Sequence, residues 1–322
     1  MKKRGFTLAE VLISLVVIGV IAAMMIPSLL ASMNEKTWNT QRKALQVRLA
    51  TVLAGMGGTS GYGTYKESTG ANNVVSVTDT AAESFVIQGI SKNLKITNVC
   101  TNDNFTPCHI ADKIANMQGT IMDTPKTLAG VGIRATNTNG VKDTKAAAFE
   151  TANEESIVVY YNPFCTNELK EFNSSYEVEK TVCATFMYDL NGLKGPNQIG
   201  KDMGIITAIY SGAPDLVSPI IVGTVTGPSK VANNQADIGT LCSKLDPDSS
   251  PATIEELTAL YANRILIGSV ASVASNGHVW SSTIVPTNMG QAWKLFSGST
   301  ANQAIAQRVE RAQAYPAICV KR

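Results

Sequence analysis

The chain has 322 residues, enough for a membrane segment and one large domain or two modest ones, since soluble domains commonly run to about 100–200 residues. Its 27 lysines and arginines nearly balance its 25 aspartates and glutamates, which leaves a formal charge of +2. This balance excludes the strongly basic footprint of many nucleic-acid-binding proteins, so we expect no nucleic-acid partner.

The first predicted element is a membrane-spanning helix close to the N-terminus. Residues 11–33 carry no charged side chain, and at about 1.5 Å per residue they are long enough to cross a hydrocarbon core about 30 Å thick. Lys2, Lys3 and Arg4 precede this run, which predicts a cytoplasmic N-terminus and places the rest of the chain outside the cytoplasm.

Two ordinary interpretations fit an apolar run of this kind. One is a plain single-span anchor. The other is a secretory signal peptide, for which Ala22, Ala23 and Ala31 supply small residues near a cleavage site. Neither interpretation explains why Gly5 and Glu10 stand between the basic residues and the unbroken apolar sequence.

Residues 2–27 read KKRGFTLAEVLISLVVIGVIAAMMIP, and this stretch closely resembles the class III signal of type IV prepilins and of the pseudopilins of type II secretion systems. In that family a membrane-embedded aspartyl peptidase, the prepilin peptidase, cuts after the glycine and methylates the new N-terminal residue. The resemblance therefore implies cleavage after Gly5 and N-methylation of Phe6. It also matches Glu10 to the family's glutamate, and Pro27 to the proline where the family's long helix is kinked or locally melted in the filament.

The chemistry of Gly5 and Glu10 agrees with these roles. A glycine leaves the backbone open to a protease at the membrane edge. A carboxylate costs about 2.5–3.5 kcal/mol at the centre of a membrane helix and less near its end, so it usually has a partner. After cleavage that partner would be the amine of Phe6, which in the family lies on a neighbouring subunit. The alternative is that Glu10 reaches the headgroups alone.

The same helix is expected to continue beyond the membrane. In residues 34–53 the side chains of Trp38, Leu45, Leu49 and Val52 lie near one face, which predicts an amphipathic helix. A helix from Phe6 to about Ala54 would be about 70 Å long. The glycines at positions 55, 57 and 58 then predict its end.

The remaining sequence predicts a mixed domain. A helix is expected over residues 80–95, with Ile87, Ile90 and Leu94 near one face and a capping box formed by Thr80 and Glu83. A second helical run begins at a capping box formed by Thr253 and Glu256. Between the two helices, strands are predicted at residues 156–161, 181–190, 204–210 and 218–225.

Six cysteines lie outside the apolar run, and their spacing contains no Cys-x-x-Cys motif, which argues against zinc knuckles and thioredoxin-like redox sites. Disulfides are favoured over six buried free thiols, because the chain is predicted to be exported. Fifteen pairings are open. We favour sequential pairing, since each pair then closes a loop of moderate length; the cysteines are Cys100, Cys108, Cys165, Cys183, Cys242 and Cys319.

The loop YDLNGLKGPNQIGKDMG, residues 188–204, carries oxygen ligands on a glycine-rich backbone. Asp189, Asn191, Asn197 and Asp202 form a set that can hold Ca²⁺, although Gly200 stands where an EF-hand would have its glutamate. Similar stretches occur in many pseudopilin-like proteins, some of which bind calcium in this region. The alternative is a hairpin whose Asp and Asn side chains cap their own backbone, and it is favoured about two to one over the calcium site.

No catalytic constellation is evident. His109 and His278 stand in unrelated contexts, and no nucleophile-elbow, metalloprotease or phosphate-binding motif is present, so we expect no enzyme and no required cofactor. Trp280 and Trp293 could belong to a recognition surface, but ordinary core positions are favoured.

The sequence thus predicts an α+β, pilin-like protein in which a long N-terminal helix packs on an antiparallel sheet of an enlarged C-terminal domain. We expect a leader at residues 1–5, a membrane and assembly half at 6–33, an amphipathic half at 34–54 and a periplasmic or extracellular domain at 55–322. The resemblance implies a subunit of a type IV pilus or of a type II secretion pseudopilus in the cytoplasmic membrane. Its partners would be other subunits, the prepilin peptidase and the inner-membrane assembly platform. The alternative function is a minor pilin whose disulfide-bonded domain is an adhesin or cargo-recognition module.

Overall fold

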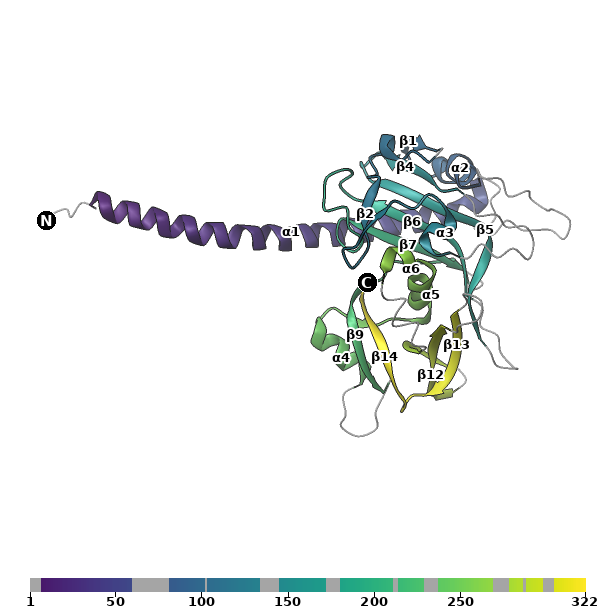
Figure 1. Ribbon diagram of the computed structural model, residues 1–322. Coiled ribbons are helices and arrows are strands. Elements are labelled where there is room, and N and C mark those ends of the chain that lie inside the picture. The colour runs from purple at the N-terminus through teal and green to yellow at the C-terminus, as the bar shows by residue number, and fades with distance from the viewer. Residues whose placement is uncertain are drawn as a thin grey trace. The chain divides into compact units, whose positions relative to one another are not determined.

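A computed structural model describes ten segments of the chain: residues 7–59, 81–101, 103–133, 145–171, 180–210, 214–228, 237–268, 278–285, 288–297 and 304–322. The chain divides into two compact units, Met1–Ala44 and Leu45–Arg322. The layout is α+β and pilin-like, with a long N-terminal helix followed by a domain of mainly antiparallel strands (Figure 1).

Helix α1 spans Leu8–Thr59 without interruption, including at Pro27. Its last turns follow the predicted amphipathic pattern, since Leu45, Leu49 and Val52 are all buried. The predicted end near Ala54 is wrong, because the helix continues through the glycines at positions 55, 57 and 58. Met56 is 3% exposed, so packing continues to support the helix where the glycines weaken it by about 1 kcal/mol each.

The helix expected over residues 80–95 is shorter and changes its hydrogen bonding along its length. It comprises α2 (Ala81–Ser84), a π-helical turn η1 (Phe85–Gly89) and a 3₁₀ turn η2 (Ile90–Lys92). The wider π turn displaces the buried face, so Phe85, Val86 and Ile90 are buried whereas Ile87 is 48% exposed. Thr80 of the expected capping box lies outside the described residues.

One part of the main sheet contains all but one of the predicted strands. Its antiparallel neighbours follow the order β1, β4, β5, β6, β7, β8. Strands β5, β6 and β7 confirm the predictions at 156–161, 181–190 and 204–210. The bounds are β1 Ile96–Cys100, β4 Ala147–Thr151, β5 Ser156–Glu171, β6 Lys180–Asp189, β7 Met203–Tyr210 and β8 Pro214–Val217.

In the other part of the sheet only one strand was predicted, at 218–225, and this range overlaps β9, which begins at Ile220. Strand β14 pairs with β9, β10 and β11, and β11 is followed by β12 and β13. A short parallel pairing between β13 and the end of β5 joins the two parts. The bounds are β9 Ile220–Pro228, β10 Ser250–Pro251, β11 Val279–Val285, β12 Asn288–Ser297, β13 Ala304–Glu310 and β14 Ala314–Lys321.

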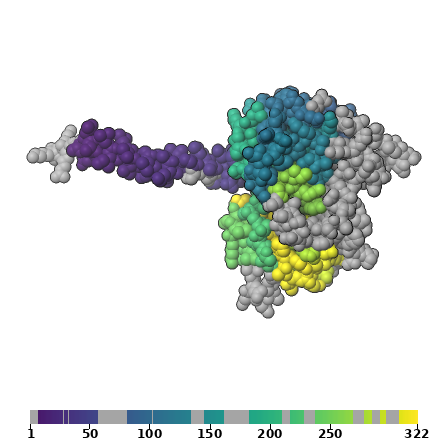
Figure 2. All heavy atoms as spheres, in the orientation of Figure 1, coloured from purple at the N-terminus to yellow at the C-terminus, as the bar shows by residue number. Residues whose placement is uncertain are grey.

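Short elements complete the globular unit. Strands β2 (Lys113–Ala115) and β3 (Ile121–Asp123) form a separate two-stranded sheet. In Figure 1, α5 and α6 lie between the two parts of the main sheet, and in Figure 2 residues 81–133 and residues 304–322 cover opposite ends of this unit. The helical bounds are η3 Thr106–Cys108, α3 Leu128–Val131, α4 Ile238–Leu245, α5 Ile254–Ala262 and α6 Arg264–Ile267.

The second predicted capping box is confirmed at the start of α5. The Thr253 backbone N–H donates to Glu256 Oε2 at 2.8 Å, and the Glu256 N–H donates to Thr253 Oγ1 at 3.2 Å. Arg322 donates to both oxygens of the same Glu256 carboxylate, at 2.6 and 2.8 Å, so the end of the chain is held against this helix. The run expected as one helix is divided at Asn263, where α5 ends and α6 begins.

The described hydrophobic core includes a large cluster and a smaller one, each of which contains a tryptophan. Trp293, 4% exposed, belongs to the large cluster, and Trp280, 1% exposed, belongs to the smaller cluster with Ile238 and Cys242 of α4. Both tryptophans are therefore core residues, as favoured from the sequence.

Candidate functional site

The polar start of α1 is the first candidate site, and it forms a capping box. The Thr7 N–H and the Thr7 Oγ1 hydroxyl both donate to Glu10 Oε2 at 2.9 Å. In return the Glu10 N–H donates to Thr7 Oγ1 at 3.3 Å. Glu10 therefore has polar partners within its own subunit, which the sequence analysis missed although the Thr-x-x-Glu pattern was present. Gly5 and Phe6 lie outside the described residues.

Beyond Glu10, α1 presents apolar side chains to its surroundings on every side. Leu15 is 60% exposed, Val16 65%, Ile18 62% and Met24 75%. The segment Leu8–Met56 is long and apolar enough to cross a membrane, with a mean hydropathy of 2.6 in its most apolar window, none of which is buried. Length and composition thus fit a membrane anchor near the N-terminus, although a signal sequence would meet the same criteria.

The cysteines of the globular unit support the sequential pairing. Cys100 is bonded to Cys108, and Cys242 is bonded to Cys319. Cys183 is also disulfide-bonded, whereas the side chain of Cys165, its expected partner, lies outside the described residues. The disulfide between Cys242 and Cys319 joins α4 to β14, and both of its cysteines belong to the smaller core cluster.

The predicted calcium loop is a second candidate site, and both oxygens of one of its carboxylates accept hydrogen bonds from the backbone. Asp202 accepts hydrogen bonds from the N–H groups of Asn197 at 2.8 Å, Gln198 at 3.0 Å and Met203 at 3.1 Å. These bonds close the loop on itself, as the hairpin alternative requires.

The other carboxylate of this loop is only half satisfied. Asp189 is 0% exposed, and its Oδ1 accepts from the Asn191 N–H at 3.0 Å, but its Oδ2 has no hydrogen-bond partner. Burial raises the pKa of Asp189 to about 7, and the nearby negative charge of Asp202 adds to the rise. The Asn191 Oδ1 atom is buried without a partner as well.

The side chain of Asn197 lies beside two backbone carbonyls of the same loop. Its side-chain amide lies 3.1 Å from the carbonyl oxygen of Gly192 and 3.3 Å from that of Lys194. The favoured orientation is the one in which the amide nitrogen donates to both carbonyls, since the amide oxygen would otherwise face only acceptors. The sequence indicated the residues of this loop but not which atoms the backbone satisfies.

The two histidines are not brought into one site. His109 contacts Glu150, with 3.2 Å between Nδ1 and Oε1, at the start of the globular unit. His278 packs against Tyr315 near the C-terminal strands, and burial and the charge of Lys294 lower its pKa. Among the described residues, no group of three or more His, Cys, Asp and Glu side chains is arranged to hold a metal ion.

The long N-terminal helix and the mainly antiparallel domain together form a pilin-like layout, and the apolar part of the helix fits a membrane anchor. Residues 1–26 match the family model of the prokaryotic N-terminal methylation motif, which supports the resemblance to type IV pilin and pseudopilin subunits. The motif is one of structural subunits rather than of enzymes. Neither the curated proteins nor the solved structures contain a significant match to the chain.

Proposed function

We propose that this protein is a structural subunit of a type IV pilus or of a type II secretion pseudopilus, cleaved after Gly5 and N-methylated at Phe6. The observation that carries the proposal is the methylation motif at residues 1–26, which includes the start of α1, a stretch whose apolar side chains are exposed in the described part of the chain. Such a helix is stable in a bilayer or among copies of itself.

Glu10 supports assembly through the amine that cleavage creates. Within the described residues of the single subunit, Thr7 donates two hydrogen bonds to this carboxylate. The cut would remove Lys2, Lys3 and Arg4 and leave a cationic amine on Phe6. Pairing of that amine with Glu10 of a neighbouring subunit would set the axial register of helices that otherwise share only apolar contacts, as one polar residue does in a coiled coil. The peptidase and the inner-membrane assembly platform would act on the same segment.

The test is a Glu10→Ala variant expressed with its native assembly machinery. We expect normal membrane insertion and a strong loss of subunit from sheared filament fractions. Glu35→Ala is the matched control, because Glu35 lies on the same helix beyond the apolar run. Normal incorporation of Glu10→Ala would contradict the pairing role.

A second candidate, a minor pilin whose domain recognises an adhesion target or cargo, is supported by the size of the globular unit, Leu45–Arg322, and of its main sheet. Deleting the gene distinguishes the two functions. A shaft subunit is required for the filaments themselves, whereas loss of a minor recognition subunit leaves filaments that no longer bind.

We also propose that the loop around Asp189 binds Ca²⁺. The support is the unpartnered buried Oδ2 of Asp189 and the unpartnered Oδ1 of Asn191, which are hard oxygen ligands of the kind Ca²⁺ takes. With Asp202 committed to the backbone, Asp189 would supply most of the charge, which predicts weak binding.

Calcium titration of the full chain in detergent tests this proposal. Millimolar Ca²⁺ should raise the melting temperature of the wild type and of Asp123→Asn, an exposed control, but not that of Asp189→Asn. No shift in the wild type would leave the loop as a self-capped hairpin.

A further inference from the structure

Strand β9 is a long edge strand of the main sheet. It has 9 residues, Ile220–Pro228, and among the described strands it pairs only with β14, beside which it lies in Figure 1. The other strands that have a single described partner in this sheet are shorter, with 5 residues in β1, 4 in β8 and 2 in β10. An edge strand offers a row of backbone N–H and C=O groups to which another strand can be added.

The middle of β9 lacks the features that usually keep edge strands apart. Proteins protect such edges with charged side chains, prolines and β-bulges, and none of the 9 residues of β9 is charged. The register shift opposite Cys319 leaves Val222 as an extra residue, which is a bulge, and Pro228 ends the strand. Between these two positions, residues 223–227 form a regular and uncharged edge.

This regular part of the edge is a palindrome. Its residues are Gly223, Thr224, Val225, Thr226 and Gly227, which read the same in both directions. If two copies pair antiparallel with Val225 opposite Val225, each glycine faces a glycine and each threonine faces a threonine. Cross-strand threonine pairs are favourable, and no like charges are brought together. The edge is therefore complementary to itself, which favours a second copy of this chain as the added strand.

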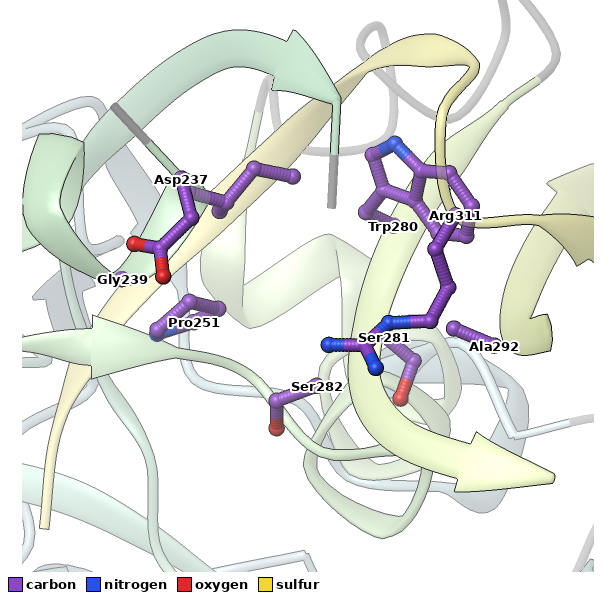
Figure 3. A pocket seen from close by; sticks show the side chains of 9 residues that line it. Asp237, Gly239, Pro251, Trp280, Ser281, Ser282, Ala292 and Arg311 are labelled. Atoms are coloured by element: carbon purple, nitrogen blue, oxygen red, sulfur yellow. The ribbon is translucent and has the colours of Figure 1, made fainter. Parts of the chain in front are cut away.

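Helix α4 covers one face of this edge and leaves an apolar side chain beside it. An added Cβ would lie 3.1 Å from Leu241 Cδ1 at Gly227, and 3.1 Å from Leu245 Cδ1 at Gly223. The start of α4 packs elsewhere, on one side of a cavity of about 220 Å³ that has Trp280 on its other side (Figure 3). Leu245 remains 50% exposed. A strand added at this edge would cover part of it.

We propose that β9 pairs with β9 of a second copy of this chain, antiparallel and centred on Val225. Leu245 of each copy would then approach Leu241 of the other, because these leucines lie over the glycines that face each other. The contact is isologous, so it closes at two copies and does not extend a filament. It is therefore separate from the helix packing of the proposed function. The ladder is short, which predicts a weak and transient dimer.

Cysteine cross-linking tests both the pairing and its register. The whole envelope fraction is used, from cells that express the chain without its assembly machinery. Thr224→Cys and Thr226→Cys, carried on two differently tagged chains, should form a mixed disulfide-linked dimer, because directly opposed Cα atoms lie about 4.5–5.5 Å apart. Either variant alone should cross-link much less, since diagonal neighbours lie about 7–8 Å apart.

The positions of these threonines make the cross-link specific. Both are exposed, and they alternate with Val225, which packs against the cluster that contains Cys242 and Cys319, so the new thiols point away from that disulfide. Thr97→Cys, an exposed threonine of β1, replaces either partner as the background control. A mixed dimer no more abundant than this background would overturn the proposal. A cross-link to a different protein would overturn it too, and would assign the edge to another partner's strand.

A charge on the edge separates this contact from association through α1. Sedimentation velocity of the full chain in detergent, over a concentration series, should show a dimer that Thr224→Lys abolishes, because the added lysine prevents strand addition. Thr97→Lys is the matched control and should dimerise like the wild type. Equal dimerisation of both variants, or a wild type that stays monomeric, would contradict the β9 contact. These experiments need neither cleavage nor methylation, so their failure is distinguishable from failure of the proposed function.

Discussion

Two stretches of α1 carry similar apolar side chains but bury them differently. In the first stretch Leu15 and Val16 are 60% and 65% exposed, whereas further along the same helix Leu45 and Leu49 are fully buried. The second stretch is covered by its own domain, where Arg48 also pairs with Glu155 and Gln46 donates to the Leu216 carbonyl at 2.6 Å. The proposed function accounts for this difference, because lipid or other subunits would then cover the first stretch.

Truncating one leucine in each stretch gives the largest expected contrast. Leu49→Ala should destabilise the globular unit by about 3–5 kcal/mol, because it leaves a cavity among buried side chains. Leu15→Ala should leave the unfolding of that unit unchanged. Guanidinium denaturation of both variants in detergent measures the contrast, and equal losses would show that the two stretches are not distinct.

Disulfides also stabilise the globular unit, in addition to the burial of apolar side chains. Replacing Cys242 and Cys319 together by serine should cost about 2–4 kcal/mol. The same change at Cys100 and Cys108 should cost less, because those cysteines are 8 residues apart in sequence, against 77 for the first pair. Denaturation midpoints of the two double variants test the order, and a larger loss from the Cys100 pair would contradict it.

The buried carboxylate of Asp189 gives the domain a pH dependence that the apolar helix lacks. Because the folded pKa of about 7 lies above the ordinary value of 3.8, the folded state binds this proton more tightly. Proton binding at Asp189 therefore stabilises the folded state. This stabilisation is fully present below pH 3.8 and is lost as the pH rises through 7, at up to about 1.4 kcal/mol per pH unit. Without calcium, the free energy of unfolding of the wild type should therefore fall relative to that of Asp189→Asn as the pH rises from 3.8 to about 7. A pH-independent difference would show that Asp189 is not titrating.

The smallest effect is expected at the start of α1. Thr7→Ala removes the capping box, which should weaken the first helical turn by about 1 kcal/mol without changing the stability of the globular unit. Thr7→Ser keeps the hydroxyl and should retain the wild-type turn. Hydrogen exchange of residues 8–11 in detergent measures the effect, and equal protection in both variants would argue against a stabilising cap.

Local patterns were enough to predict part of the fold. Apolar periodicity indicated the buried face of Leu45 and Leu49, and residue order alone gave the capping box at Thr253. Alternating β-branched and aromatic residues predicted the centres of β5, β6 and β7. These features depend on neighbours three or four positions away, or on alternation along a single strand.

Features that depend on distant contacts were missed. The glycines after Ala54 do not end α1, because Met56 packs in the core. Met56 also packs closely against Gly89, where an added Cβ would lie 2.2 Å from Met56 Cε. Gly89 is the last residue of the unexpected π turn, so this turn lies at a contact between distant parts of the sequence. Strands β11–β14 are joined to the rest through β13 and the far end of β5, a pairing that no local pattern encodes. The unsatisfied oxygen of Asp189 likewise follows from burial, which residue identity alone does not reveal.

Mass spectrometry of the mature N-terminus tests the central claim most directly. The chain should be expressed with its native peptidase, extracted from the membrane and digested for analysis of its first peptide. The account predicts a peptide that begins at Phe6 and carries one added methyl group on its amine. A mature chain that begins at Met1, or after an alanine near residue 23, would contradict it.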